Sequence, residues 1–104
     1  MVVNDGYLIV LFDLPVKTKE ERKRYSRFRR NLLKNGYLML QKSIYYKYIR
    51  ELRALDIEKN KIHKYCPMEG NIKIIRLTKK QFESIASILG DKRIDNTFID
   101  YIEY

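Results

Sequence analysis

The chain is poor in the residues that build disulfides and soft-metal sites. It has one cysteine, Cys66, and one histidine, His63, among 104 residues. A single cysteine excludes an intrachain disulfide, and such scarcity is typical of a protein in a reducing cytoplasm. These two residues are also too few for a zinc site within one chain. We therefore expect a cytoplasmic protein in which any metal is a hard cation held by carboxylates.

Long apolar runs are absent as well. None approaches the ~18 residues of a membrane-spanning helix, and MVVNDG at the start lacks the regions of a signal peptide. We expect no contact with a membrane. Apolar residues make up 45% of the chain and charged residues 34%, a balance typical of a globular protein. A length of 104 residues suits one domain and not two, so we predict a single domain over residues 1–104.

Acidic residues are outnumbered, and the imbalance is uneven. The chain has 22 lysines and arginines against 13 acidic residues, a net charge of +9. Between residues 17 and 34, nine basic residues accompany two glutamates, a local net charge of +7. An excess concentrated on one segment predicts an anion-binding face rather than general solubility.

The predicted elements follow the order strand, helix, strand, strand, helix, strand, which is the βαββαβ order of ferredoxin-like folds. We therefore predict an α+β protein with one antiparallel sheet and helices on one face. The geometry of the joint at Gln41-Lys42 stays open, since neither glycine nor proline marks it. The strands are expected at 7–12, 37–41, 43–49 and 71–77, and the helices at 18–35 and 50–65.

Two additions follow this core. A capping box at Thr78 predicts a short third helix that ends at Gly90, with Phe82, Ile85 and Leu89 directed inward. The tail at residues 97–104 has strand character. One sheet face has no cover, so we expect another subunit to cover it.

The apolar run at residues 7–12 ends in Asp13. A carboxylate beside a core is costly unless hydrogen bonds, a partner charge, a metal or open water stabilise it. Asp13 is therefore either a strand-ending residue that faces water or a metal ligand. One carboxylate holds magnesium poorly, whereas two Asp13 side chains from a symmetric dimer would suit it better. The sequence leaves both interpretations open.

The helix at 18–35 is predicted to carry a basic ridge opposite its apolar stripe of Tyr25, Phe28, Leu32 and Leu33. Charged residues on a helix usually form a solvated face, but like charges one turn apart repel each other, and a polyanion would relieve that repulsion. Such side chains contact phosphates and read no bases, so we expect affinity without sequence preference. The ridge consists of Lys23, Arg27, Arg30 and Lys34.

Three stretches together carry a resemblance: YLIVLFDLP, TKEERKRYSRFRRNLLKNGYLMLQKSIY and GNIKIIRLT. They resemble the CRISPR-associated protein two family, the small adaptation subunit. Gly36 followed by Gln41-x-Ser43-Ile44-Tyr45 is similar to that family's Gly…Gln-x-Ser-Val-Phe/Tyr element. The stretch FDLPVKTKEERKRY resembles members from systems with a single large RNA-guided effector.

The resemblance implies a ferredoxin-like homodimer in which residues 97–104 add a strand to the partner's sheet. It also implies that Asp13 from both subunits binds a divalent metal, Mg²⁺, for cleavage of RNA or duplex DNA. The family's other role, in antiviral defence, is a scaffold that holds duplex DNA for a separate integrase during spacer acquisition. We favour the scaffold with endonuclease activity as a further property. The alternative is a ferredoxin-like nucleic-acid binder without a CRISPR role or catalysis.

Overall fold

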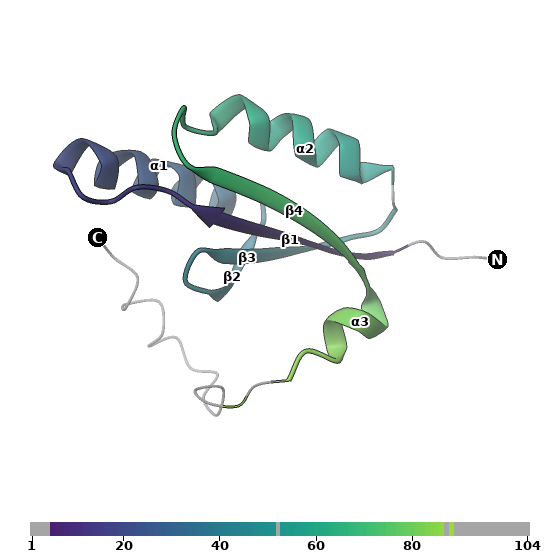
Figure 1. Ribbon diagram of the computed structural model, residues 1–104. Coiled ribbons are helices and arrows are strands. Elements are labelled where there is room, and N and C mark those ends of the chain that lie inside the picture. The colour runs from purple at the N-terminus through teal and green to yellow at the C-terminus, as the bar shows by residue number, and fades with distance from the viewer. Residues whose placement is uncertain (1–4, 52, 87, 89–104) are drawn as a thin grey trace.

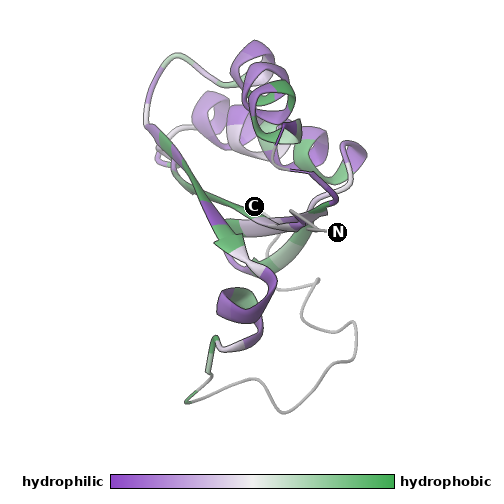
Figure 2. Cartoon of the chain, turned by 90° about the vertical axis from the view of Figure 1, so that its right-hand side faces the viewer, coloured by the Kyte–Doolittle hydropathy of each residue, from purple (hydrophilic) through white to green (hydrophobic). Residues whose placement is uncertain are grey.

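The computed structural model describes residues 5–51, 53–86 and 88 and contains one four-stranded antiparallel sheet. Its strand order is β2-β3-β1-β4, and α1 and α2 cover one face while α3 lies on the other side (Figures 1 and 2). The predicted α+β, ferredoxin-like fold is confirmed. The elements are β1 (Gly6–Asp13), α1 (Lys19–Lys34), β2 (Leu38–Gln41), β3 (Ile44–Ile49), α2 (Ala54–Tyr65), β4 (Asn71–Thr78) and α3 (Lys79–Glu83).

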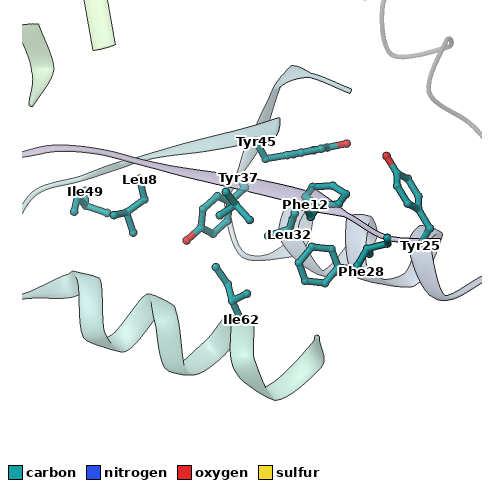
Figure 3. Close-up of a cluster of buried hydrophobic side chains, with 11 residues drawn as sticks. Leu8, Phe12, Tyr25, Phe28, Leu32, Tyr37, Tyr45, Ile49 and Ile62 are labelled. Carbon is teal, nitrogen blue, oxygen red and sulfur yellow. The ribbon is translucent and has the colours of Figure 1, made fainter. Parts of the chain in front are cut away.

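The core lies between the sheet and the two helices α1 and α2. Alternate residues of β1 (Leu8, Val10 and Phe12) are buried in it, because successive side chains of a strand point to opposite faces. Figure 3 shows Leu8 and Phe12 of this strand among side chains from β3, α1 and α2. From α1 the core receives Tyr25, Phe28 and Leu32, from the α1–β2 connection Tyr37, from β3 Tyr45 and Ile49, and from α2 Ile62.

Helix α1 begins and ends on local signals that the sequence carries. Thr18 forms a capping box with Glu21, in which each side chain accepts a hydrogen bond from the other residue's backbone N–H. At the other end Gly36 has φ +91°, and the backbone N–H of Tyr37 donates to Leu32 O at 3.0 Å. This is a glycine-dependent Schellman ending. Of the predicted apolar stripe, only Leu33 is wrong, because it is 40% exposed.

Two predicted boundaries are wrong. Helix α2 begins at Ala54 rather than at residue 50, because β3 pairs with β1 as far as Ile49 and a turn then follows. Helix α3 ends at Glu83, and Ile85 is 50% exposed rather than inward. The hydroxyl of Ser84 donates to Gln81 O at 2.7 Å and so satisfies a carbonyl that a longer helix would use. Leu89, Gly90 and residues 97–104 lie outside the described residues.

A buried carboxylate joins α2 to the sheet. Glu58 is 5% exposed and accepts a hydrogen bond from the Tyr37 hydroxyl at 3.0 Å. Its other oxygen is 2.9 Å from Lys47 Nζ on β3. Burial, together with the nearby negative charge of Glu58, raises the pKa of Tyr37 well above its usual range, so its hydroxyl stays a donor. Figure 3 shows Tyr37 between the sheet and α2.

We predict that Lys47→Met lowers the free energy of unfolding by about 3 kcal/mol, because it leaves the buried Glu58 carboxylate without the nearer and less exposed of its two cations. Lys61→Met is the matched control: Lys61 lies 3.9 Å from the same carboxylate but is half exposed, so its loss should cost under about 1 kcal/mol. Urea unfolding followed by circular dichroism measures both. Equal losses in the two variants would contradict the prediction.

Candidate functional site

Asp13 is the last residue of the central strand and is exposed to solvent. It pairs with Asn71 of β4. Its side chain lies on the sheet face opposite the core, which we call the second face. Gly70 packs against its backbone: a Cβ there would lie 2.6 Å from Asp13 O, and Gly70 has φ +105°. The backbone around Asp13 is therefore closely held, while its carboxylate faces outward.

A hollow of about 450 Å³ opens beside this carboxylate. Of the residues that the structure describes, two lysines, Lys42 and Lys73, line it together with one carboxylate, that of Asp13. Sequence reasoning missed both lysines. The pairing of β1 with β4 is the signal that would have found Lys73, since Leu11 pairs with Lys73 two residues before Asp13. The remaining lining residues are Leu11, Phe12, Ser43, Ile44 and Asn71.

The joint that the sequence left open is a β2–β3 turn with Ser43 in a left-handed conformation, φ 64°. This conformation costs about 1 kcal/mol for a residue with a Cβ. Two contacts hold it: the Ser43 hydroxyl lies 2.8 Å from the Tyr25 hydroxyl, and Ser43 O accepts the Phe12 N–H at 3.0 Å. The turn that carries Lys42 is thus fastened to α1 and to the end of β1.

The connection from Asp13 to α1 is braced by charged side chains. Glu21 Oε1 accepts the backbone N–H groups of Lys17 at 2.8 Å and Thr18 at 2.9 Å. The hydrogen bond from the Thr18 backbone is the largest cause that holds the pKa of Glu21 below its usual value. Arg22 donates to the carbonyls of Val16 and Lys17. These amides and the Arg22 side chain are therefore hydrogen-bonded within the chain and stabilise this connection.

The predicted basic ridge lies on α1 with all four side chains exposed (Lys23, Arg27, Arg30 and Lys34). A shallow hollow of about 490 Å³ lies along the helix, lined by Lys19, Arg22, Lys23, Ser26, Arg27 and Arg30. The residues of this hollow and those beside Asp13 are different sets. The described part of the chain thus has two distinct hollows, one along α1 and one beside Asp13.

The donor atoms beside Asp13 determine whether a magnesium ion fits there. Among the described residues, no three His, Cys, Asp or Glu side chains come together. One carboxylate with water and substrate phosphate oxygens is the smallest set that proteins use for Mg²⁺, and a second carboxylate strengthens it. Asp13, with Asn71, whose side chain also carries a hard oxygen, lining the same hollow, fits the ion as part of a site.

Several other polar and aromatic residues lie outside these two hollows. His63 is exposed on α2, and the free thiol of Cys66 donates to its backbone oxygen at 3.3 Å. Tyr45 is fully buried in the core. Tyr7 on β1 stacks on Phe82 of α3, with ring centroids 3.9 Å apart. In the part of the chain that the structure covers, no helix is long and apolar enough to span a membrane.

The fold and these two hollows define a small ferredoxin-like α+β protein with a carboxylate at the end of its central strand. Residues 6–85 match the family model of CRISPR associated protein Cas2, and the chain belongs to this family. The family membership predicted from the sequence motifs is confirmed.

Individual relatives agree. The chain is 36% identical to "CRISPR-associated endoribonuclease Cas2" of Ligilactobacillus salivarius over 85 residues, which cover 82% of this chain and 84% of that protein. It is 40% identical to the protein of the same description from Treponema denticola over 88 residues, 85% of this chain and 87% of that protein. A solved structure described as "Crystal structure of cas2" has the same fold: the TM-score is 0.58, with 17% identity, over 88% of this chain and 97% of the other.

We predict that Ser43→Ala is less stable than Ser43→Gly by about 1 kcal/mol. Both variants lack the hydroxyl that contacts Tyr25, but only alanine keeps a Cβ in the left-handed conformation. Chemical denaturation of the two variants measures the difference. A glycine variant no more stable than the alanine variant would show that the turn relaxes out of this conformation in solution.

Proposed function

We propose that this protein is a CRISPR adaptation subunit that binds duplex DNA as a homodimeric scaffold for an integrase. The observation that carries the proposal is the exposed basic ridge on α1, a row of cations that suits a phosphate backbone. A metal-dependent endonuclease activity at Asp13, on RNA or DNA, is the second part of the proposal. The names of the relatives, which describe endoribonucleases, support this part.

A homodimer is supported by the second face of the sheet. Three large apolar side chains remain exposed there: Leu38 at 56%, Tyr48 at 44% and Ile75 at 45%. Burial of this apolar area against a partner lowers the free energy of association. Asp13 lies on the same face, at its end, so a second copy packed there would bring its own Asp13 toward the first.

At the Asp13 site, the carboxylate would hold the cation and the strand end would fix its position. When bound, Mg²⁺ supplies a Lewis acid for a phosphate oxygen and lowers the pKa of a water molecule. The chain's own part is positional: Gly70 and the Ser43 turn hold the backbone beside Asp13. The lysines of the hollow provide positive charge for a phosphate to approach.

The proposed scaffold role in spacer acquisition does not require Asp13 to react. Backbone contacts by lysine and arginine position a duplex without reading its sequence, which fits a subunit that must accept spacers of any sequence. We propose that the ridge carries this role, and that an integrase is the protein partner. With a single cysteine, the chain suits the reducing cytoplasm where these reactions would take place.

We predict that Asp13→Asn abolishes metal-dependent cleavage while duplex binding remains. The change removes the charge that holds the cation and keeps the size of an exposed side chain. The assay compares wild type and variant on end-labelled duplex DNA and on single-stranded RNA, with Mg²⁺ or with chelator. Cleavage that survives in the variant would point to a contaminating nuclease or to another site. Equal gel shifts with no cleavage by either protein would leave only the scaffold part of the proposal standing.

We predict that Arg27→Gln combined with Arg30→Gln reduces the slope of log K against log salt for duplex DNA by roughly 0.9 for each cation removed from a phosphate. The matched control is Lys59→Gln with Lys64→Gln, which removes the same charge from exposed positions on α2. Fluorescence anisotropy titrations over a range of salt concentrations measure both. Equal changes in the two double variants would mean that net charge, rather than the ridge, attracts the duplex.

A further inference from the structure

Among the residues that the structure describes, two lysines and one carboxylate line the hollow beside Asp13. Lys42 comes from the β2–β3 turn and Lys73 from β4. A site built only to hold a cation would not place the ammonium group of Lys73 in the same hollow as its ligand, because like charges repel. Lys73 is instead suited to an anion that approaches Asp13.

The position of Lys73 follows from strand pairing. Asp13 pairs with Asn71 and Leu11 pairs with Lys73, so Lys73 lies diagonally across the ladder from Asp13 on the same face. Lys73 is exposed. Among the described residues, no salt bridge joins it to Asp13. Lys73 and Asp13 thus line the same hollow without forming an ion pair with each other.

Lys42 is placed by a different part of the fold. It precedes Ser43, the residue held in a left-handed turn by Tyr25 and by the Phe12 N–H. Because these contacts fasten the turn, the backbone of Lys42 has a fixed position at the rim of the hollow. Two independent connections, one β-ladder and one strained turn, thus bring lysines to the same place.

We propose that Lys73, assisted by Lys42, is a phosphate-binding residue that contacts a backbone phosphodiester of the nucleic acid at the Asp13 site. This inference rests on the proposed function and names which of the chain's residues position the phosphate beside the carboxylate. Ammonium groups bind the non-bridging oxygens of a phosphate as point charges. Lys73 is a positioning residue in this arrangement, and binding needs neither metal nor cleavage.

The test uses full-length protein with the Asp13→Asn change, in chelator, so that binding is measured without cleavage. Lys73→Gln is added to this background, with Lys59→Gln on α2 as the control that removes the same charge elsewhere. Lys73→Arg tests whether charge at this position suffices. Duplex DNA of fixed length is titrated by fluorescence anisotropy at several salt concentrations, and melting temperatures confirm that every variant folds.

Lys73→Gln should weaken binding about fivefold or more near 0.1 M salt. It should also reduce the salt slope by roughly 0.9 for each phosphate that it no longer neutralises, since neutralising a phosphate releases counterions. Lys59→Gln should change neither quantity comparably, and Lys73→Arg should restore both. A Lys73→Gln variant that behaves like Lys59→Gln overturns the inference. If binding is abolished on changing Arg27 and Arg30 but not Lys73, the proposed function stands and this inference alone fails. Absence of duplex binding by every variant overturns both.

Discussion

The pairing of β1 with strands on both of its sides is the constraint on which the rest of this structure depends. β1 pairs with β3 from Gly6 to Leu11 and with β4 from Gly6 to Asp13. A shift by one residue would turn Leu8, Val10 and Phe12 out of the core, because side chains alternate between faces. The same shift would move Asp13 to the helix-covered face. Core and candidate site are therefore fixed by one register.

The register also explains why the β1–β4 pair extends beyond β1–β3. After Leu11, the partner strand β3 has ended and the Ser43 turn takes its place, where the Ser43 carbonyl accepts the Phe12 N–H. The pairing with β4 continues as far as Asn71. Asp13 therefore has a paired strand on one side and lies near the Ser43 turn on the other. The hollow lies at the end of the sheet where β3 no longer pairs with β1 but β4 still does.

The parts of the fold that the sequence predicted correctly are those with local causes. The capping box at Thr18 and the glycine at position 36 need only their neighbours in the chain, and helix α1 begins and ends as they indicate. The ridge on α1 was predicted for the same reason, since helical spacing alone determines which residues share a face. Helix α3 also begins at its predicted cap, Thr78. Two features that the sequence did not predict depend on pairings between distant residues. Nothing near Ser43 in the sequence indicates a left-handed turn, because the stabilising hydroxyl comes from Tyr25 on another element. Lys73 was missed because its place beside Asp13 follows from the β1–β4 ladder rather than from spacing.

Two kinds of charged group can be distinguished among the described residues. Glu21, Arg22 and Glu58 are bound to partners within the chain and serve the fold. Arg27 and Arg30, like the other exposed cations of the ridge, project where like charges repel and gain little from the protein itself. Because these exposed cations repel each other, the ridge lowers the stability of the free protein. Under the proposed function, a bound polyanion would offset that cost.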